Sequence, residues 1–258
     1  MVAGVDLIEV GEGPAVVLLH GLLGSPAYLM PLARSLARSG RRVLVPWLPG
    51  HGRSLPVRPF GFGAAADRLA DAVALLGVER PALLGHSLGA PLVVHWALRR
   101  EVRSLVAASP VGVVPLDLSW SRWLLPAAPV VASAARAGAG RVAASAAGRR
   151  VVFGWFVGMA RPQAVGSRMG AELIRGAADA APVVAEVLDQ LRGLRLAEDA
   201  AGLRIPALVI WGDLDAHAGN GPGLADALSG ETHVLPGCGH MPTLEAPYSF
   251  RRALDGWL

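Results

Sequence analysis

The stretch from Gly85 to Gly89 reads G-H-S-L-G and places Ser87 between two glycines. It stands between the apolar run Ala82–Leu84 and a segment of helical spacing, which predicts a tight strand-to-helix turn. Such a turn strains the backbone of its central residue, and the flanking glycines remove the Cβ atoms that would clash there. Ser87 would then project at the edge of a sheet as a nucleophile. An ordinary glycine-rich turn is the competing interpretation.

A serine hydroxyl is a weak nucleophile at neutral pH and needs a base to take its proton as it attacks. His240 lies in the glycine-punctuated segment from Leu235 to Pro242, after the last predicted strand and before the C-terminal helix. That segment leaves the carboxyl end of the sheet, where ligands bind in open α/β sheets. His240 is therefore the predicted base.

This base needs a carboxylate that fixes the imidazole tautomer and stabilises its charged form. Two aspartates follow the apolar run Ala207–Trp211, and we choose Asp215. Asp213 comes directly after a turn glycine and is expected to brace the loop instead. Asp117, after the fifth predicted strand, is a distant alternative.

Two backbone amides are expected to stabilise the oxyanion that forms when a carbonyl is attacked. The Leu88 amide opens the helix after the serine, where first-turn amides point at the nucleophile. The turn from His20 to Ser25 is expected to supply the second donor, and the Leu22 amide is the candidate. His20 itself is interpreted as a structural hydrogen-bonding residue.

Short apolar runs alternate with longer segments of helical spacing, a pattern that predicts a parallel sheet with helices on both faces. The predicted strands are Val5–Val10, Ala15–Leu19, Arg42–Pro46, Pro81–Gly85, Val102–Ala108, Ile205–Trp211 and Thr232–Leu235. The predicted helices are Ala27–Ser39, Ala64–Leu76, Leu88–Arg99, Gly223–Leu228 and Thr243–Leu258. The predicted fold class is α/β, with a mostly parallel, doubly wound sheet.

The alternation is interrupted once, over residues 110–203, where the strand signals fade. We expect a mostly helical cap there, because a structureless loop of that length is improbable in a compact domain. Residues 1–109 and 204–258 then form the core domain. The cap's apolar side chains suggest a pocket for an apolar small molecule, although about half of them are expected to fill the cap's own core. The candidates for the pocket lining are Trp120, Trp123, Phe153, Phe156 and Met159.

The 258-residue chain is 53% hydrophobic, with a mean hydropathy of +0.44, which is ample for a large core. Its longest apolar stretch, Trp123 to Ala135, contains two prolines and is shorter than the roughly 20 residues of a membrane-spanning helix. The first residues lack the basic-then-apolar order of a secretory signal. We therefore expect cytoplasmic residence and no membrane partner.

All 24 basic residues are arginine, and the formal net charge is +4. The arginines occur singly or in pairs among acids and form no basic stripe, so no nucleic-acid partner is expected. The single cysteine, Cys238, has no second thiol and no Cys/His spacing pattern around it. No internal disulfide, metal site or cofactor is expected.

Five motifs in the correct order resemble the α/β-hydrolase superfamily over nearly the whole chain. They are H-G-x-x-G at His20–Gly24, P-G-H-G-x-S at Pro49–Ser54, the serine turn at Gly85–Gly89, W-G-x-x-D at Trp211–Asp215 and G-x-G-H-x-x-x-x-E-x-P at Gly237–Pro247. The resemblance implies a capped serine hydrolase with Ser87 as nucleophile, Asp215 as acid and His240 as base. It also implies that Leu22 and Leu88 supply the oxyanion amides.

Two details qualify this resemblance. Relatives that open epoxides or remove halides carry an aspartate in place of Ser87, so those reactions are disfavoured. The proline that usually follows the family acid is replaced by residues 216–221. His217, in this segment, is interpreted as a solvated loop residue.

The resulting expectation is a hydrolase that cleaves an ester of an apolar small molecule through an acyl-enzyme on Ser87. One alternative is C–C bond hydrolysis, or a lyase or cyclisation reaction, because relatives reuse the same triad for such chemistry. Another is a non-catalytic ligand-binding protein on this fold. That second alternative usually comes with a lost triad member, and none is lost here.

Overall fold

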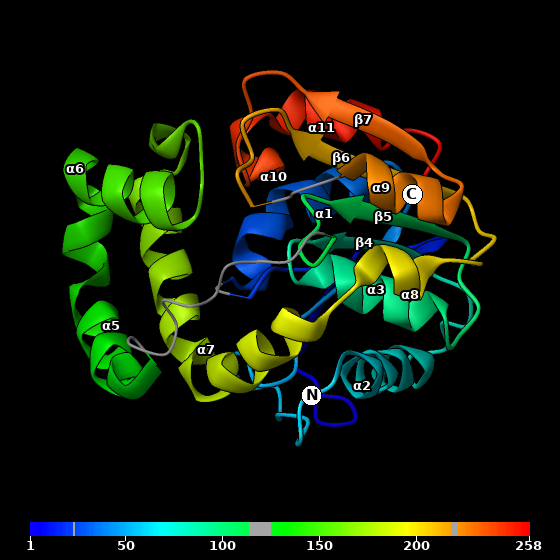
Figure 1. Ribbon diagram of the computed structural model, residues 1–258, viewed down its shortest axis with the longest axis horizontal. Helices are drawn as coiled ribbons and strands as arrows, with labels where there is room; N and C mark the ends of the chain where they lie inside the picture. The colour runs from blue at the N-terminus through cyan, green and yellow to red at the C-terminus, as the bar shows by residue number, and fades with distance from the viewer. Residues whose placement is uncertain (23, 114–124, 218–220) are drawn as a thin grey trace.

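A computed structural model describes residues 1–22, 24–113, 125–217 and 221–258. These residues form a seven-stranded sheet flanked by helices, with a helical layer beside it (Figure 1). Each strand lies within two residues of a predicted one, and the expected α/β fold is confirmed. The strands are β1 (Leu7–Val10), β2 (Ala15–Leu19), β3 (Arg42–Pro46), β4 (Ala82–His86), β5 (Ser104–Ala108), β6 (Ala207–Gly212) and β7 (Glu231–Leu235).

The strand order β1-β3-β2-β4-β5-β6-β7 determines where the site forms. All neighbours pair in parallel except β1, which is antiparallel to β3 at the edge. The chain leaves β2 for β3 on one side and returns to β4 on the other side of β2. Connections at the carboxyl ends of β2 and β4 therefore diverge, and such a switch point is where open α/β sheets bind ligands. Leu19 and His86 end these two strands.

Helices cover both faces of the sheet. One face carries α2 (Phe62–Ala74), α3 (Gly89–Ala97), α8 (Leu196–Ala200) and α9 (Gly221–Leu228). The other carries η1 (Pro26–Leu29), α1 (Met30–Arg38), α10 (Pro242–Glu245) and α11 (Pro247–Ala253).

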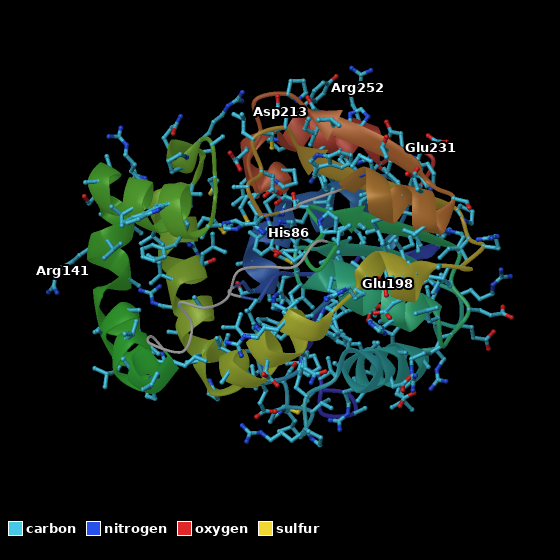
Figure 2. All side chains as sticks on the ribbon, viewed as in Figure 1. His86, Arg141, Glu198, Asp213, Glu231 and Arg252 are labelled. Carbon is cyan, nitrogen blue, oxygen red and sulfur yellow. The ribbon has the colours of Figure 1, made fainter. Side chains whose placement is uncertain are left out.

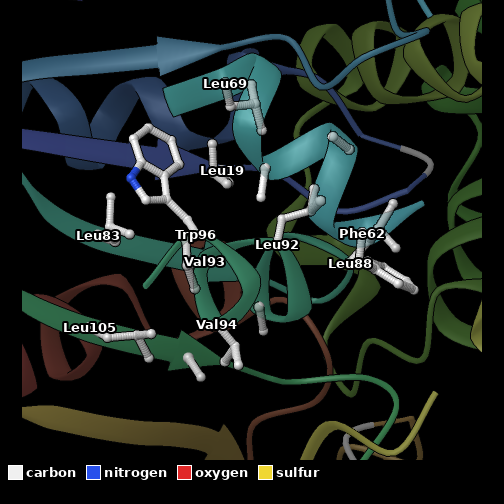
Figure 3. Packing of buried hydrophobic residues seen from close by; sticks show 14 of the residues in the cluster. Leu19, Phe62, Leu69, Leu83, Leu88, Leu92, Val93, Val94, Trp96 and Leu105 are labelled. Atoms are coloured by element: carbon white, nitrogen blue, oxygen red, sulfur yellow. The ribbon is translucent and has the colours of Figure 1, made fainter. Parts of the chain in front are cut away.

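The core consists of two buried clusters, one on each face of the sheet. Alternate residues of a strand point to opposite faces, so Val17 and Leu19 join one cluster while Val16 and Leu18 join the other. Figure 3 shows part of the first cluster, where Trp96 of α3 packs among leucines and valines. Charged side chains such as Arg141, Glu231 and Arg252 point outward (Figure 2).

Between β5 and β6, all the described residues with regular secondary structure are helical. This segment contains η2 (Leu125–Ala127), α5 (Ala128–Ala144), α6 (Ala146–Arg149), the π-helical η3 (Arg150–Phe156), η4 (Pro162–Ala164) and the long α7 (Ser167–Gly193). Small side chains at Ala139 and Ala143 are buried and allow α5 to pack closely against α7. We call residues 125–193, which contain η2, α5, α6, η3, η4 and α7, the cap. The following helix, α8, packs against α3 and α9 and so lies with the core helices.

The C-terminal helix differs from the prediction of one element over Thr243–Leu258. It is divided into α10 and α11 at Ala246, which has φ −138° and ψ 52°. Pro247 explains the break, because a proline ring disfavours helical geometry in the preceding residue and lacks the amide needed to continue the ladder.

Candidate active site

The turn between β4 and α3 holds Ser87 in a strained conformation, as its glycine flanks predict. Ser87 has a φ of 55°, in the left-handed region that a residue with a side chain rarely adopts. Its amide is held by the Ala108 carbonyl at 2.9 Å. A Cβ on Gly85 would overlap the Gly89 carbonyl, and a Cβ on Gly89 would lie 2.5 Å from the Leu19 carbonyl oxygen. Only glycine therefore fits at either flank.

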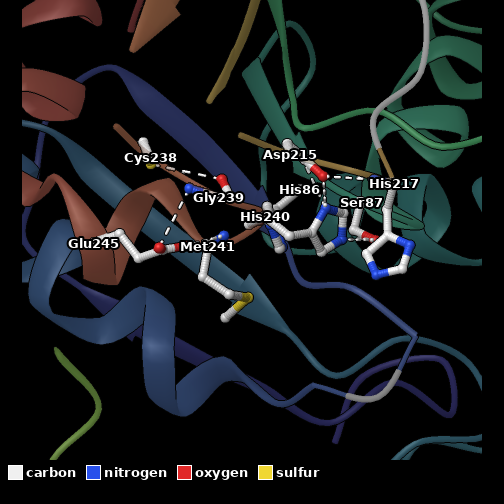
Figure 4. A network of polar contacts seen from close by, with 9 residues as sticks. All are labelled: His86, Ser87, Asp215, His217, Cys238, Gly239, His240, Met241 and Glu245. Carbon is white, nitrogen blue, oxygen red and sulfur yellow. Dashed lines mark hydrogen bonds and ion pairs between the residues drawn. The ribbon is translucent and has the colours of Figure 1, made fainter. Parts of the chain in front are cut away.

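Ser87, His240 and Asp215 meet at the carboxyl edge of the sheet (Figure 4). His240 Nε2 lies 2.9 Å from Ser87 Oγ, and His240 Nδ1 lies 3.0 Å from both carboxylate oxygens of Asp215. An ionised carboxylate only accepts, so the imidazole proton resides on Nδ1. Nε2 is then free to accept the serine proton, which is the arrangement that a general base requires.

Asp215 is well placed to remain ionised. Its side chain is fully buried, whereas that of His240 is 9% exposed. Burial alone would raise the pKa of Asp215, but the hydrogen bond and charge of His240 and the His217 amide together lower it to about 2. The neighbouring Asp213 instead accepts the Cys238 amide at 3.3 Å and braces the loop, as expected. The alternative acid, Asp117, lies outside the described residues.

The turn after β2 lies beside the nucleophile. A Cβ on Gly21 would sit 3.4 Å from Ser87 Oγ. The Gly21 carbonyl accepts from His20 Nδ1 at 2.8 Å and from the Gly24 amide at 3.0 Å. Because C=O and N–H point in opposite directions across a trans peptide, fixing this carbonyl also fixes the direction of the Leu22 amide.

Two buried histidines brace this turn. His20 Nε2 accepts the Leu48 amide at 3.1 Å, so its proton is on Nδ1, and its role agrees with the predicted structural one. His51 Nε2 hydrogen-bonds the Leu22 carbonyl. The other candidate donor, the Leu88 amide, stands at the N-terminus of α3, where first-turn amides have no intrahelical acceptor.

Glu245 holds the main chain on both sides of His240. The residue is 5% exposed, and its carboxylate accepts the amides of Gly239 at 3.2 Å and Met241 at 3.0 Å (Figure 4). It also accepts the Arg161 amide of the cap at 2.8 Å. Glu245 has no role of its own among the site residues predicted from the sequence. The available signal was a single acid in an otherwise uncharged stretch after the histidine.

The cap also contacts the catalytic loop directly. The His240 amide donates to the Gly158 carbonyl at 3.0 Å. Gly158 has a φ of 76°, and a Cβ there would lie 2.6 Å from the His217 ring. His217 is half-buried, with its ring edge-on to that of His240 and the centroids 5.2 Å apart. The expectation of a solvated loop residue is therefore wrong, because the cap covers this loop.

The five predicted pocket residues fall into three environments. Phe153 and Met159 lie in a buried cluster with cap residues such as Ile174. Phe156 is 65% exposed on η3. Trp120 and Trp123 lie outside the described residues. A pocket role for these five side chains stays a prediction.

Neither a metal centre nor a membrane span is found within the described ranges. No group of three histidine, cysteine or carboxylate side chains there is arranged to hold a metal ion. Of the helices assigned in those ranges, none combines the length and apolarity needed to cross a bilayer. Cys238 is buried and unpaired by any disulfide.

A serine, a histidine and an aspartate at the switch point of this sheet define a class of protein. Residues 14–151 match the family model of the alpha/beta hydrolase fold. The chain belongs to this α/β-hydrolase family, as its motifs implied.

Individual relatives agree with this membership. The chain is 33% identical over 257 residues to a pimeloyl-[acyl-carrier protein] methyl ester esterase of Chromobacterium violaceum, covering 95% of this chain and 94% of that protein. It is 36% identical over 107 residues to the mouse sn-1-specific diacylglycerol lipase ABHD11, covering 40% of this chain. The matched segment spans about a third of the length of that lipase and of three mycobacterial relatives.

A solved structure, the enol-lactonase from Burkholderia xenovorans LB400, has the same fold. It superimposes with a TM-score of 0.76 at 20% sequence identity, covering 98% of this chain and 95% of that one. Esterase and lipase relatives thus share this family, and the fold extends over almost the whole chain.

Proposed function

We propose that this protein is a serine hydrolase that cleaves an ester of an apolar small molecule through an acyl-enzyme intermediate. The observation that carries the proposal is the unbroken chain Asp215–His240–Ser87, with its hydrogen bonds of 3.0 and 2.9 Å and its strained serine. The methyl ester esterase relative, which aligns along almost the full length, supports ester chemistry.

The mechanism follows from the position of each group. Ser87 Oγ attacks the ester carbonyl while His240 Nε2 takes its proton, and Asp215 stabilises the resulting imidazolium. The Leu22 and Leu88 amides bind the oxyanion of the tetrahedral intermediate. His240 then protonates the departing alcohol, and a water deprotonated by the same imidazole releases the acid from Ser87.

An apolar substrate fits the polarity of the surroundings. Most residues that flank the triad in sequence, including Leu88, Leu214 and Met241, have hydrocarbon or thioether side chains. The cap adds further apolar side chains, including Phe153, Phe156 and Met159. Burying hydrocarbon contributes about 25 cal/mol per Å², which favours acyl chains over polar ones.

A panel of aryl esters of increasing acyl length, together with a fluorophosphonate probe, tests the proposal. Wild-type protein is expected to hydrolyse esters and to be labelled on one serine, and Ser87→Ala is expected to lose both activities. The matched control is Ser229→Ala, because Ser229 is an exposed serine that also has a positive φ of 50°. Normal labelling of the Ser87→Ala variant, or no turnover of any ester by the wild type, would overturn the proposal.

A further inference from the structure

A buried chain of hydrogen bonds connects the turn beside the nucleophile to the catalytic histidine. Tyr28 of η1 and His86 of β4 are each 1% exposed. The Gly21 amide lies 2.8 Å from Tyr28 Oη, which lies 2.8 Å from His86 Nδ1. His86 Nε2 in turn lies 2.6 Å from the main-chain carbonyl of His240. The mechanism above uses none of these side chains.

The direction of each bond is determined by the groups at the two ends. The Gly21 amide only donates, so Tyr28 Oη accepts from it. The His240 carbonyl only accepts, so the proton of His86 is on Nε2. Nδ1 is then an acceptor, and it takes the single hydroxyl proton of Tyr28. Every donor and acceptor in the chain is therefore used once, in a single direction.

Both side chains are held neutral. Burial and the nearby His240 lower the pKa of His86 to about 3, and burial raises the pKa of Tyr28 well above its ordinary value. Neither group therefore gains or loses a proton near neutral pH, and the direction of the chain stays fixed. The rings lie edge-on, with centroids 5.5 Å apart.

We propose that Tyr28 and His86 are positioning residues that set the spacing between the oxyanion-forming turn and His240. Tyr28 holds the N–H of Gly21, and the next peptide along the chain carries the Leu22 N–H, the proposed oxyanion donor. The His86 end holds the carbonyl of the base itself. The inference rests on the proposed hydrolase function, because it assigns these residues to the geometry of that reaction.

Tyr28→Phe removes one oxygen atom and breaks two of the three bonds. We expect kcat for an aryl ester to fall between about 10- and 100-fold, with KM changed less than about twofold, because small displacements of reacting groups cost this much. Tyr248→Phe is the matched control, since Tyr248 is the only other tyrosine in the chain and is exposed. It should keep the wild-type kcat.

Substitutions of His86 separate positioning from mere packing. In His86→Gln the side-chain amide still donates to the His240 carbonyl, whereas His86→Leu fills the space without a donor. The glutamine variant should retain at least about fivefold more kcat than the leucine variant, within the range that geometry controls. Equal losses in both variants would overturn the proposal, as would a folded Tyr28→Phe protein with kcat within twofold of wild type.

A spectroscopic measurement keeps this test separate from the proposed activity. The proton shared by His240 Nδ1 and Asp215 gives a downfield NMR resonance that Asp215→Asn removes. Tyr28→Phe should shift or broaden this resonance, and Tyr248→Phe should leave it unchanged. If wild-type protein hydrolyses no ester, the hydrolase proposal fails while this resonance still tests the positioning. An unchanged resonance in Tyr28→Phe would overturn the positioning role.

Discussion

The roles of Asp215 can be separated by exchanging one atom. Asp215→Asn keeps the size of the side chain, but its amide group donates where the carboxylate accepted. His240 would then present Nδ1 as an acceptor and carry its proton on Nε2, where it cannot take the proton of Ser87. We expect kcat to fall about 10⁴-fold, as in other Ser-His-Asp triads, with little change in KM.

Steady-state kinetics of Asp215→Asn and of Asp213→Asn provide the measurement and its control. Asp213 lies two residues away and contacts only the loop amide of Cys238 among the bonds described above. The kcat of Asp213→Asn should stay within about tenfold of wild type, because a hydrogen bond that holds the loop contributes less to catalysis than the carboxylate of the triad. A larger loss in Asp213→Asn than in Asp215→Asn would contradict the assignment of the acid.

Local sequence patterns were sufficient to predict the three triad residues. Ser87 lies on a five-residue turn signature, and His240 and Asp215 lie on loops that follow apolar strands, so each has a local signal. Tyr28 and His86 have none, because their contact joins positions 58 residues apart and His86 reaches His240 across 154 residues. Only the folded chain brings these positions together.

At the scale of elements, the turn between β4 and α3 tolerates no side chain at its glycines. Gly85→Ala would place a methyl group on the Gly89 carbonyl, and neither backbone segment can move without displacing Ser87. We expect the variant to lose about 3 kcal/mol or more of the free energy of unfolding and to label poorly with a fluorophosphonate.

Gly140→Ala is the matched control for that substitution. Gly140 lies within α5, is exposed, and has no atom within 4 Å of an added Cβ. Alanine there should raise the free energy of unfolding by about 0.5–1 kcal/mol, because it restricts the unfolded chain and favours the helix. Urea unfolding of both variants measures the contrast. A Gly85→Ala protein as stable as Gly140→Ala would contradict the steric argument.

The prediction of helices failed where helical spacing did not determine the local backbone geometry. Helical spacing runs through Thr243–Leu258, but Pro247 divides that segment into α10 and α11. Spacing also gave no sign that residues 150–156 adopt a π-helix, which ends two residues before Gly158, whose carbonyl accepts the His240 amide. The strands were predicted closely because buried parallel strands are continuous apolar runs, and that signal is local.

At the scale of the whole molecule, buried neutral histidines make the free energy of unfolding depend on pH. Burial and His51 lower the pKa of His20 well below its ordinary value, and His86 has a pKa of about 3. In the unfolded chain these two imidazoles therefore bind protons that they do not bind in the folded protein. Stability is complete above the unfolded pKa of about 6.5 and is lost as the pH falls below it. The pKa of Asp215 is lowered as well, to about 2, so this carboxylate adds to the loss of stability only below about pH 4.

Between pH 7 and pH 5, each of the two histidines should lower the free energy of unfolding by about 2 kcal/mol, because the imidazole of the unfolded chain becomes protonated over that range. Together they remove about 4 kcal/mol, a large part of the 5–15 kcal/mol typical of a domain. Urea unfolding at both pH values measures this loss. His86→Gln should reduce it by about 2 kcal/mol, whereas His233→Gln, at an exposed position on β7, should leave it unchanged. Equal wild-type stability at pH 7 and pH 5 would show that these imidazoles do accept protons in the folded protein, and the fixed polarity of the Tyr28–His86 chain would then be lost as well.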